Sequence, residues 1–257
     1  MVWWKNPLET TFPQRKKINK KKRIILSSFH NFTDTSTSCP NDREDKNEAL
    51  AAKKSVLLSS FYFAPIGYYA TLFRSDEAII ETHDHYQRQS YRNRCLIGGA
   101  NGTIALNIPI EKPRADTRVM KDVRIANHGN WRHVHWHAIL SAYNMTPYFE
   151  YYKDDFIPFF EKRYHFLHDF NEAIRQKICE LIAIQTPVSS TAHYIKNLST
   201  DTIDCREAFH PKRQLNKEMA WQPREYHQVF LHKHGFIPNL SIIDLLFNMG
   251  NESRLYL

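Results

Sequence analysis

The sequence predicts an α/β domain in which a small sheet, with a parallel βαβ unit and a β-hairpin, packs with a mostly helical C-terminal half. Three observations support this prediction. Two short apolar runs flank a helical pattern soon after residue 55, and an Asn-Gly turn separates two extended segments. Apolar residues then recur at intervals of three and four through much of the second half.

The βαβ unit comes first. Residues 56–58 and 78–81 are apolar runs typical of buried strands. Between them, Pro65 is a residue favoured at the first position of a helix, and apolar residues follow at helical spacing through 66–74. A strand, a helix and a strand within about 26 residues predict two parallel strands joined by a right-handed crossover.

A hairpin is predicted next. Residues 92–97 are extended, 98–102 supply the turn, and 103–109 alternate between apolar and other residues. The alternation places four side chains on one face of the second strand: Ile104, Leu106, Ile108 and Ile110. Residues 111–120, which include Pro113, are expected to form a polar loop.

Helical patterns dominate the rest of the chain. We expect helices over 131–144 and 148–153, and a longer one that Pro158 opens and that runs toward residue 184. Residues 185–223 show little periodicity and predict a long connection with short elements.

Two further helices are predicted near the C-terminus. The first covers 225–233 and ends at Gly235. The second is opened by a capping box of Ser241 and Asp244 and is closed by Gly250.

The positive charge of the chain is concentrated in its first 54 residues. The net charge is +8, and residues 1–54 hold 12 Lys/Arg against 6 Asp/Glu, which leaves a net of +2 for the remainder. A like-charge block and a polar stretch favour disorder. We therefore expect 1–54 to be a disordered basic tail and 55–257 to be the domain. A nucleic-acid-binding arm is the alternative for the tail, but nucleic acid is not the expected partner.

The sequence also bears on location. It contains no secretory signal, and no stretch approaches the ~20 apolar residues of a membrane span. The cysteines lie too far apart for CxxC pairs and suit reduced thiols: Cys39, Cys95, Cys179 and Cys205. We expect a cytoplasmic protein; the oligomeric state is left open.

Side chains suited to an anionic small molecule follow the two predicted parallel strands. Ligands bind beyond the carboxyl ends of such strands, and the helix opening at Pro65 would direct unpaired N–H groups at the same crevice. The arginines of 92–94 would share a strand face and suit phosphate or carboxylate; the alternative is an edge strand whose arginines form salt bridges. The predicted substrate-binding residues are Tyr62, Tyr68, His85, Tyr86, Gln89, Arg92, Asn93, Arg94 and Trp131.

Three histidines occur close together at 133–137. His133 and His137 have the spacing of a helical metal pair, but no carboxylate or thiol stands at a fixed ligand spacing, so neither a metal nor another cofactor is expected. His135 falls on the side of Trp131 and Ile139, as a core histidine would. If it lines the crevice instead, it is the candidate catalytic acid or base.

Several blocks of this sequence resemble the WbqC-like family, in the order in which they occur there. They are SFYFAPIGYY at 60–69, YQRQSYRNR at 86–94, LNIPI at 106–110, the Trp131, His135 and Trp136 positions, Ser141-Ala142-Tyr143 with Pro147-Tyr148-Phe149, and GFIPNLSIIDLLFN at 235–248. Arg88 stands where the family pattern has lysine, which keeps the charge but not the chemistry of a lysine contact. The tail has no counterpart.

The resemblance implies a pathway and not a mechanism. The family is associated with bacterial surface polysaccharides of the O-antigen type. We therefore expect an enzyme that transfers a group on an activated sugar or phosphorylated metabolite. The alternative is a non-catalytic protein that binds a sugar intermediate or scaffolds the same pathway.

Overall fold

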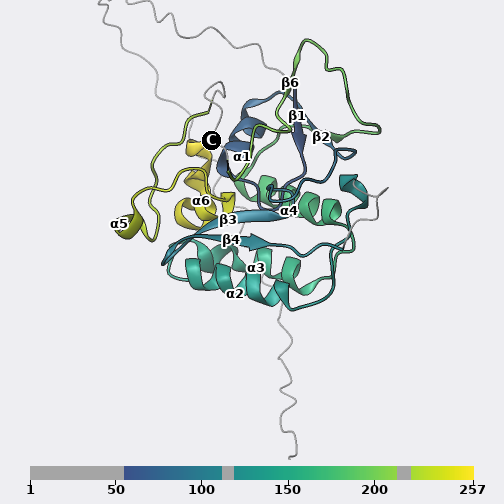
Figure 1. The fold of residues 1–257 in the computed structure, drawn as a ribbon. Coiled ribbons are helices and arrows are strands. Elements are labelled where there is room, and N and C mark those ends of the chain that lie inside the picture. Colours follow the sequence, from purple (N-terminus) through teal and green to yellow (C-terminus); the bar gives the residue numbers. More distant parts are fainter. Residues whose placement is uncertain (1–54, 112–118, 213–220) are drawn as a thin grey trace, which may run out of the picture. The chain divides into compact units, whose positions relative to one another are not determined.

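The computed structural model describes residues 55–111, 119–212 and 221–257 (Figure 1). The predicted tail and Pro113 lie outside the described residues. The elements in chain order are β1 (Ser55–Ser59), α1 (Ile66–Arg74), β2 (Ala78–Glu81), β3 (Arg94–Gly99), β4 (Gly102–Asn107), η1 (Met120–Asp122), α2 (Trp131–Tyr143), α3 (Phe149–Glu161), α4 (Leu167–Ile182), β5 (Val188–Ser190), β6 (Thr202–Asp204), α5 (Leu231–His234), α6 (Ile242–Met249) and η2 (Gly250–Tyr256).

A four-stranded parallel sheet forms around the predicted βαβ unit. β1 and β2 pair in parallel, as predicted, with Leu57 opposite Ile79. Two strands from the predicted long connection complete the sheet: β5 pairs with β2, and β6 pairs with β1. The order is β5-β2-β1-β6, so in chain order the strands run third, second, first, fourth. The direction of strand addition therefore reverses between β1 and β6.

The predicted hairpin is formed by β3 and β4, an antiparallel pair in which Arg94 lies opposite Asn107. On β4 and just beyond it, Leu106 and Ile108 are buried, as the alternation predicts. Ile104, near the turn, is 38% exposed and departs from the pattern. β3 begins at Arg94, so the prediction that Arg92 shares a strand face with Arg94 is wrong: Arg92 belongs to the turn before the strand.

The helices of the second half surround a core rich in aromatic residues. The hairpin lies between α6 on one side and α2 on the other, and β3 contacts both (Figure 1). Phe247 of α6 packs against Tyr143, Phe149 and Phe156, with ring centroids 5.1 to 5.5 Å apart. Aromatic pairs at these distances add to the stabilisation that burial provides.

Pro158 does not open a helix. It lies inside α3, which ends at Glu161, and a separate helix, α4, begins at Leu167. Buried residues continue through the proline at intervals of three and four, so core packing outweighs the missing N–H donor. Pro158 itself is exposed, which keeps its ring out of the core.

The predicted helix over 225–233 is largely absent: only Leu231–His234 is helical, and Gly235 ends it with a positive φ. The capping box is also wrong, although α6 starts where it was expected. The Ser241 hydroxyl donates to the carbonyl of Phe63, and the Asp244 carboxylate accepts from tyrosines elsewhere in the fold. Tertiary partners have replaced the local ones.

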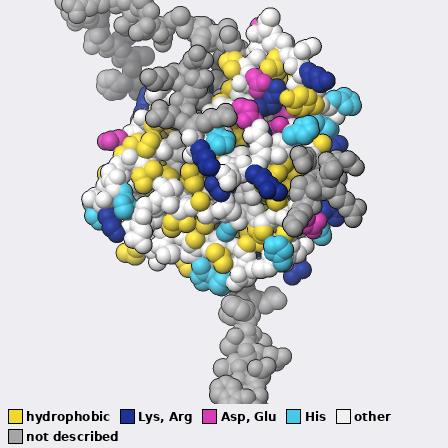
Figure 2. All heavy atoms as spheres, viewed as in Figure 1, with side chains coloured by type: hydrophobic (Ala, Val, Ile, Leu, Met, Phe, Trp, Pro, Cys, Tyr) yellow, Lys and Arg dark blue, Asp and Glu magenta, His cyan; other side chains and the backbone are white. Residues whose placement is uncertain are grey.

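Charge is mixed on the face drawn in Figure 2, where basic, acidic and apolar side chains intersperse over the described residues. Within that described part of the chain, no helix has the length and apolar character needed to cross a membrane.

Gly250, which ends α6, is expected not to tolerate a side chain. Its φ is +57°, and a Cβ there would meet the Tyr148 ring at 2.6 Å. Gly250→Ala should therefore lower the free energy of unfolding by about 2 kcal/mol, through overpacking added to backbone strain. Urea denaturation measures this. Gly235→Ala is the control, because φ is +70° but nothing lies within 4 Å of its Cβ. Equal effects of the two variants would contradict the role of the Tyr148 contact.

Candidate functional site

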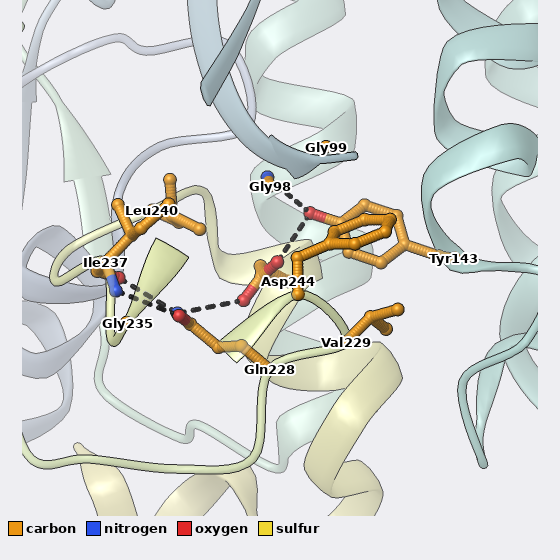
Figure 3. A pocket seen from close by; sticks show the side chains of 10 residues that line it. Gly98, Gly99, Tyr143, Gln228, Val229, Gly235, Ile237, Leu240 and Asp244 are labelled. Atoms are coloured by element: carbon orange, nitrogen blue, oxygen red, sulfur yellow. Dashed lines mark hydrogen bonds between the residues drawn. The ribbon is translucent and has the colours of Figure 1, made fainter. Parts of the chain in front are cut away.

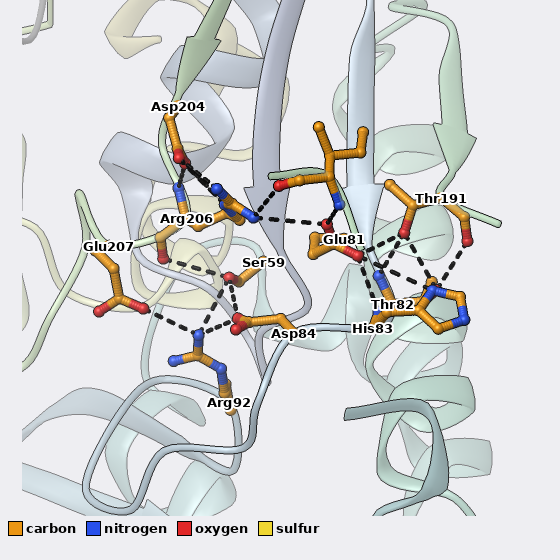
Figure 4. A network of polar contacts seen from close by, with 11 residues as sticks. Ser59, Glu81, Thr82, His83, Asp84, Arg92, Thr191, Asp204, Arg206 and Glu207 are labelled. Atoms are coloured by element: carbon orange, nitrogen blue, oxygen red, sulfur yellow. Dashed lines mark hydrogen bonds and ion pairs between the residues drawn. The ribbon is translucent and has the colours of Figure 1, made fainter. Parts of the chain in front are cut away.

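Polar side chains gather at the carboxyl ends of the parallel strands (Figure 4). Ser59 ends β1, Glu81 ends β2, Thr191 follows β5 and Asp204 ends β6. In open parallel sheets, ligands bind at this edge, where the strand order reverses. The reversal between β1 and β6 therefore marks this cluster as the candidate site.

Arg92 is the centre of the cluster near β1. Its Nη2 forms an ion pair with the Asp84 carboxylate and lies 3.2 Å from Oε1 of Glu207 and 3.3 Å from Oγ of Ser59. The Ser59 hydroxyl donates to the same carboxylate at 2.9 Å. Arg92 is only 1% exposed, and its Nε has no hydrogen-bond partner among the described residues. A buried guanidinium is thus fixed from several segments at once.

Glu81 organises the neighbouring part of the same edge. Its fully buried carboxylate accepts from the backbone N–H of His83, the Thr191 hydroxyl and the backbone N–H of Ile195. Arg206 Nη1 lies 3.6 Å from it. These contacts tie the segment between β5 and β6 to the end of β2.

The hydroxyl of Tyr86 lies within electrostatic reach of three arginines. Burial raises its pKa, while the guanidinium groups of Arg88, Arg92 and Arg94 act in the opposite direction. Arg88 is exposed and Arg94 is half-buried, with its Nε donating to Oδ1 of Asn107 at 2.5 Å. Two of the predicted site residues, Arg92 and Arg94, thus lie within electrostatic reach of a third, Tyr86.

His135 lies beneath Asn107. Its Nε2 is 3.2 Å from the Asn107 carbonyl, and its Nδ1 is 3.0 Å from the Tyr62 hydroxyl. Because a carbonyl only accepts, the proton is assigned to Nε2, and the Tyr62 hydroxyl donates to Nδ1. Burial lowers the pKa of His135 to about 4, against the smaller opposing effect of the Asn107 hydrogen bond. The ring is therefore neutral at pH 7 and partnered at both nitrogens.

The other predicted site residues lie outside this arrangement or support it. Trp131 packs edge-on against His135, with ring centroids 5.1 Å apart. Asn93 donates to the Ile108 carbonyl, and His85 is exposed and forms a β-bridge with Val119. Tyr68 is in the core, and Gln89 accepts from Lys212.

The start of α1 is not an anion site. The backbone N–H of Ile66 donates to the Leu240 carbonyl, and that of Gly67 donates to Oδ1 of Asn239. The expectation of unpaired donors at this helix end is therefore wrong, because the loop before α6 closes it.

Sequence reasoning missed most of the partners of these arginines. Ser59 and Asp84 had a usable signal, since they follow the two predicted strands by one and three residues. Glu207 had none, because its place depends on how β1 and β6 pair. Asn107 gave no sign that its carbonyl would meet His135.

A second polar network lies around Asp244, which is 2% exposed (Figure 3). Tyr143 donates to Oδ1 at 2.7 Å and Tyr226 donates to Oδ2 at 2.5 Å. Burial raises the pKa of Asp244, and its hydrogen bonds oppose that shift. The adjoining space for the centre of a water molecule is only about 10 Å³, room for roughly one water. This network is therefore assigned to packing and not to a substrate.

Among the described side chains, His133 and His137 have no partners with which they could form a metal centre. The rings of His133 and His137 lie 4.0 Å apart at their centroids. Over residues 55–111, 119–212 and 221–257, no group of three or more His, Cys, Asp or Glu side chains has an arrangement that could hold a metal ion.

Comparisons with known proteins agree with the sequence blocks. The chain is 25% identical over 230 residues to the uncharacterized protein Rv1507c of Mycobacterium tuberculosis (strain ATCC 25618 / H37Rv), with 80% of this chain and 97% of that protein covered. No solved structure matched the chain significantly. The model of the WbqC-like protein family matches residues 60–220 and 194–256, nearly the whole described domain. This chain belongs to the WbqC-like protein family.

Proposed function

We propose that this chain is a cytoplasmic enzyme of bacterial surface polysaccharide production that transfers a group on an activated sugar or phosphorylated metabolite. The observation that carries the proposal is Arg92, which contacts Ser59 and Asp84 at the sheet edge where the strand order reverses, with Arg88 and Arg94 beside it within electrostatic reach of Tyr86. Arginines present planar donors that match phosphate and carboxylate oxygens.

Arg94 and Arg88 are the proposed first contacts of the anion, because neither has a carboxylate as ion-pair partner among the described residues. Arg92 can join them if Glu207 gives way. The Glu207 side chain is 46% exposed, and its Oε1 lies 3.2 Å from Nη2 of Arg92. Because Glu207 can turn to water, an incoming anion could take its place as the ion-pair partner of Arg92. Asp84 would keep Arg92 in place.

A catalytic role for His135 requires the ring to exchange one of its two partners for the substrate. The geometry that supports such a role is its contact with Asn107, which links it to Arg94. The same observation favours the second candidate, a non-catalytic binding protein of this pathway, because a buried, neutral histidine with both nitrogens occupied has no free atom for proton transfer.

Arg94→Ala is expected to weaken the binding of inorganic pyrophosphate by at least about tenfold, as the loss of a charge-assisted hydrogen bond implies. Isothermal titration calorimetry measures this directly. Arg254→Ala is the matched control: Arg254 is exposed and lies over the Phe73 ring, in a different part of the fold. Equal binding by wild type and Arg94→Ala would refute the proposed anion site.

Turnover separates the two candidates. If nucleotide-sugars bind and phosphorus NMR detects their conversion by wild type but not by His135→Gln, the proposal that the chain is an enzyme is supported. Binding without any conversion by wild type, over a panel of activated sugars and acceptors, would favour the non-catalytic protein.

A further inference from the structure

A groove of about 390 Å³ lies beside the proposed anion site. Its lining includes Tyr91, Leu96, Thr103, Ala208, Ile237 and Pro238. This volume falls within the range of small-molecule sites. Nothing assigned so far to the arginine cluster uses it.

The groove and Arg94 share one face of the hairpin. Side chains alternate along a strand, so Arg94 and Leu96 of β3 point to the same side, about 7 Å apart. Opposite them on β4 stand Asn107 and Ala105. One ligand can therefore lie along this face, with an anionic group at Arg94 and an uncharged group in the groove.

Two residues of the groove lining are adjacent in sequence to the Arg92–Glu207 ion pair. Tyr91 lines the groove and precedes Arg92, and Ala208 lines it and follows Glu207. The groove thus begins one residue away from the ion pair at two separate points.

The lining is suited to a flat heteroaromatic ring. It combines an aromatic ring and aliphatic side chains with the hydroxyl of Thr103 and the carboxamide of Asn239. Oδ1 of Asn239 accepts from the Gly67 N–H at 2.8 Å, which fixes the orientation of the amide. Its Nδ2 has no hydrogen bond to a described residue, so two donors remain for a ligand carbonyl.

We propose that the groove binds the base of a nucleoside diphosphate, with a ring carbonyl of the base accepting from Asn239 Nδ2 and the diphosphate lying at Arg94. This rests on the proposed function, because it names the activated form of the substrate that the anion site would hold. UDP, whose base bears ring carbonyls, is the probe. ADP, whose base has none, is its natural comparison.

The test measures the dissociation constants of UDP, ADP and pyrophosphate by calorimetry. Wild type should bind UDP about tenfold tighter than pyrophosphate and more tightly than ADP. Ala208→Phe should remove the excess affinity for UDP and leave pyrophosphate unchanged. Ala138→Phe is the control, because Ala138 is also half-buried but lines a different hollow, beside the hairpin turn.

Asn239→Asp provides a second variant that spares the fold. An aspartate can still accept from the Gly67 N–H and tolerates the left-handed φ of +55°, but it cannot donate. It should weaken the binding of UDP by about threefold to tenfold and narrow the difference in affinity between UDP and ADP. The affinity for pyrophosphate should not change.

The inference is overturned if wild type binds UDP no tighter than pyrophosphate, or if Ala208→Phe and Ala138→Phe act alike. If decyl phosphate binds more tightly than UDP and neither UDP nor ADP displaces it, the inference is also overturned, in favour of a lipid ligand. If UDP binding depends on Ala208 while Arg94→Ala leaves pyrophosphate unchanged, the groove stands and the proposed anion site fails. If pyrophosphate binding depends on Arg94 but UDP binds no more tightly than pyrophosphate, the anion site stands and the groove inference fails.

Discussion

Replacing Arg92 with alanine is expected to lower the free energy of unfolding by about 3–5 kcal/mol, because it leaves a buried carboxylate without its counterion. Asp84 is 8% exposed, and among the described residues it keeps only the Ser59 hydroxyl as a side-chain donor once the guanidinium is gone. Glu207 is 46% exposed and can turn to water, so its share of the loss should be small. Urea denaturation followed by tryptophan fluorescence measures the change.

Two variants show whether the stranded charge is the cause. Arg88→Ala removes an exposed arginine four residues away and should change stability by no more than about 0.5 kcal/mol. Adding Asp84→Asn to Arg92→Ala should recover part of the loss, since a neutral amide costs less to bury than a carboxylate. An Arg92→Ala protein within about 1 kcal/mol of wild type would show that Arg92 is not a structural ion-pair partner.

The strong local patterns in the sequence predicted the frame of the fold. Short apolar runs around a helical pattern gave the parallel pair β1 and β2, and the turn at Gly102 gave the hairpin. These succeeded because burial and turn chemistry act on neighbouring residues and leave a readable period.

The elements that failed depend on contacts between distant residues. β5 and β6 have three residues each and become strands only by pairing with β2 and β1. Asp244 has the spacing of a capping residue but accepts from Tyr143, 101 positions earlier. Single-sequence patterns do not carry such partners.

The candidate site shows the same division. The rule that ligands bind beyond the strand ends pointed to Arg92, which contacts Ser59 at the sheet edge, and to Tyr86 and Arg94, which lie within electrostatic reach of each other. The rule says nothing about which carboxylates will hold the arginines. Glu207 reaches Arg92 across 115 positions, through a strand that the sequence did not reveal.

The buried His135 should make the domain less stable as the pH falls from about 6.5 toward 4. Burial lowers its pKa to about 4, whereas in the unfolded chain a histidine has an ordinary value near 6.5. Below about 6.5 the unfolded state binds the proton first, so acid favours unfolding. The contribution is fully present above that pH, and about 3 kcal/mol of it is lost by pH 4.

His135→Gln isolates this effect, because glutamine stays neutral and so removes the group that takes up the proton. Other groups act in or near the same window: His168 also has a lowered pKa, whereas Asp244 has a raised one and opposes the slope. The informative quantity is therefore the difference between wild type and variant in unfolding free energy, measured by urea denaturation at pH 7, 6, 5 and 4.5. That difference should shrink by about 2 kcal/mol toward pH 4.5.

His133→Gln, at an exposed position on the same helix, is the control and should keep the wild-type dependence of unfolding free energy on pH. A difference that does not change with pH would mean that the Tyr62–His135–Asn107 contacts open and admit water well above pH 4, which is also the condition under which His135 could take a proton from a substrate.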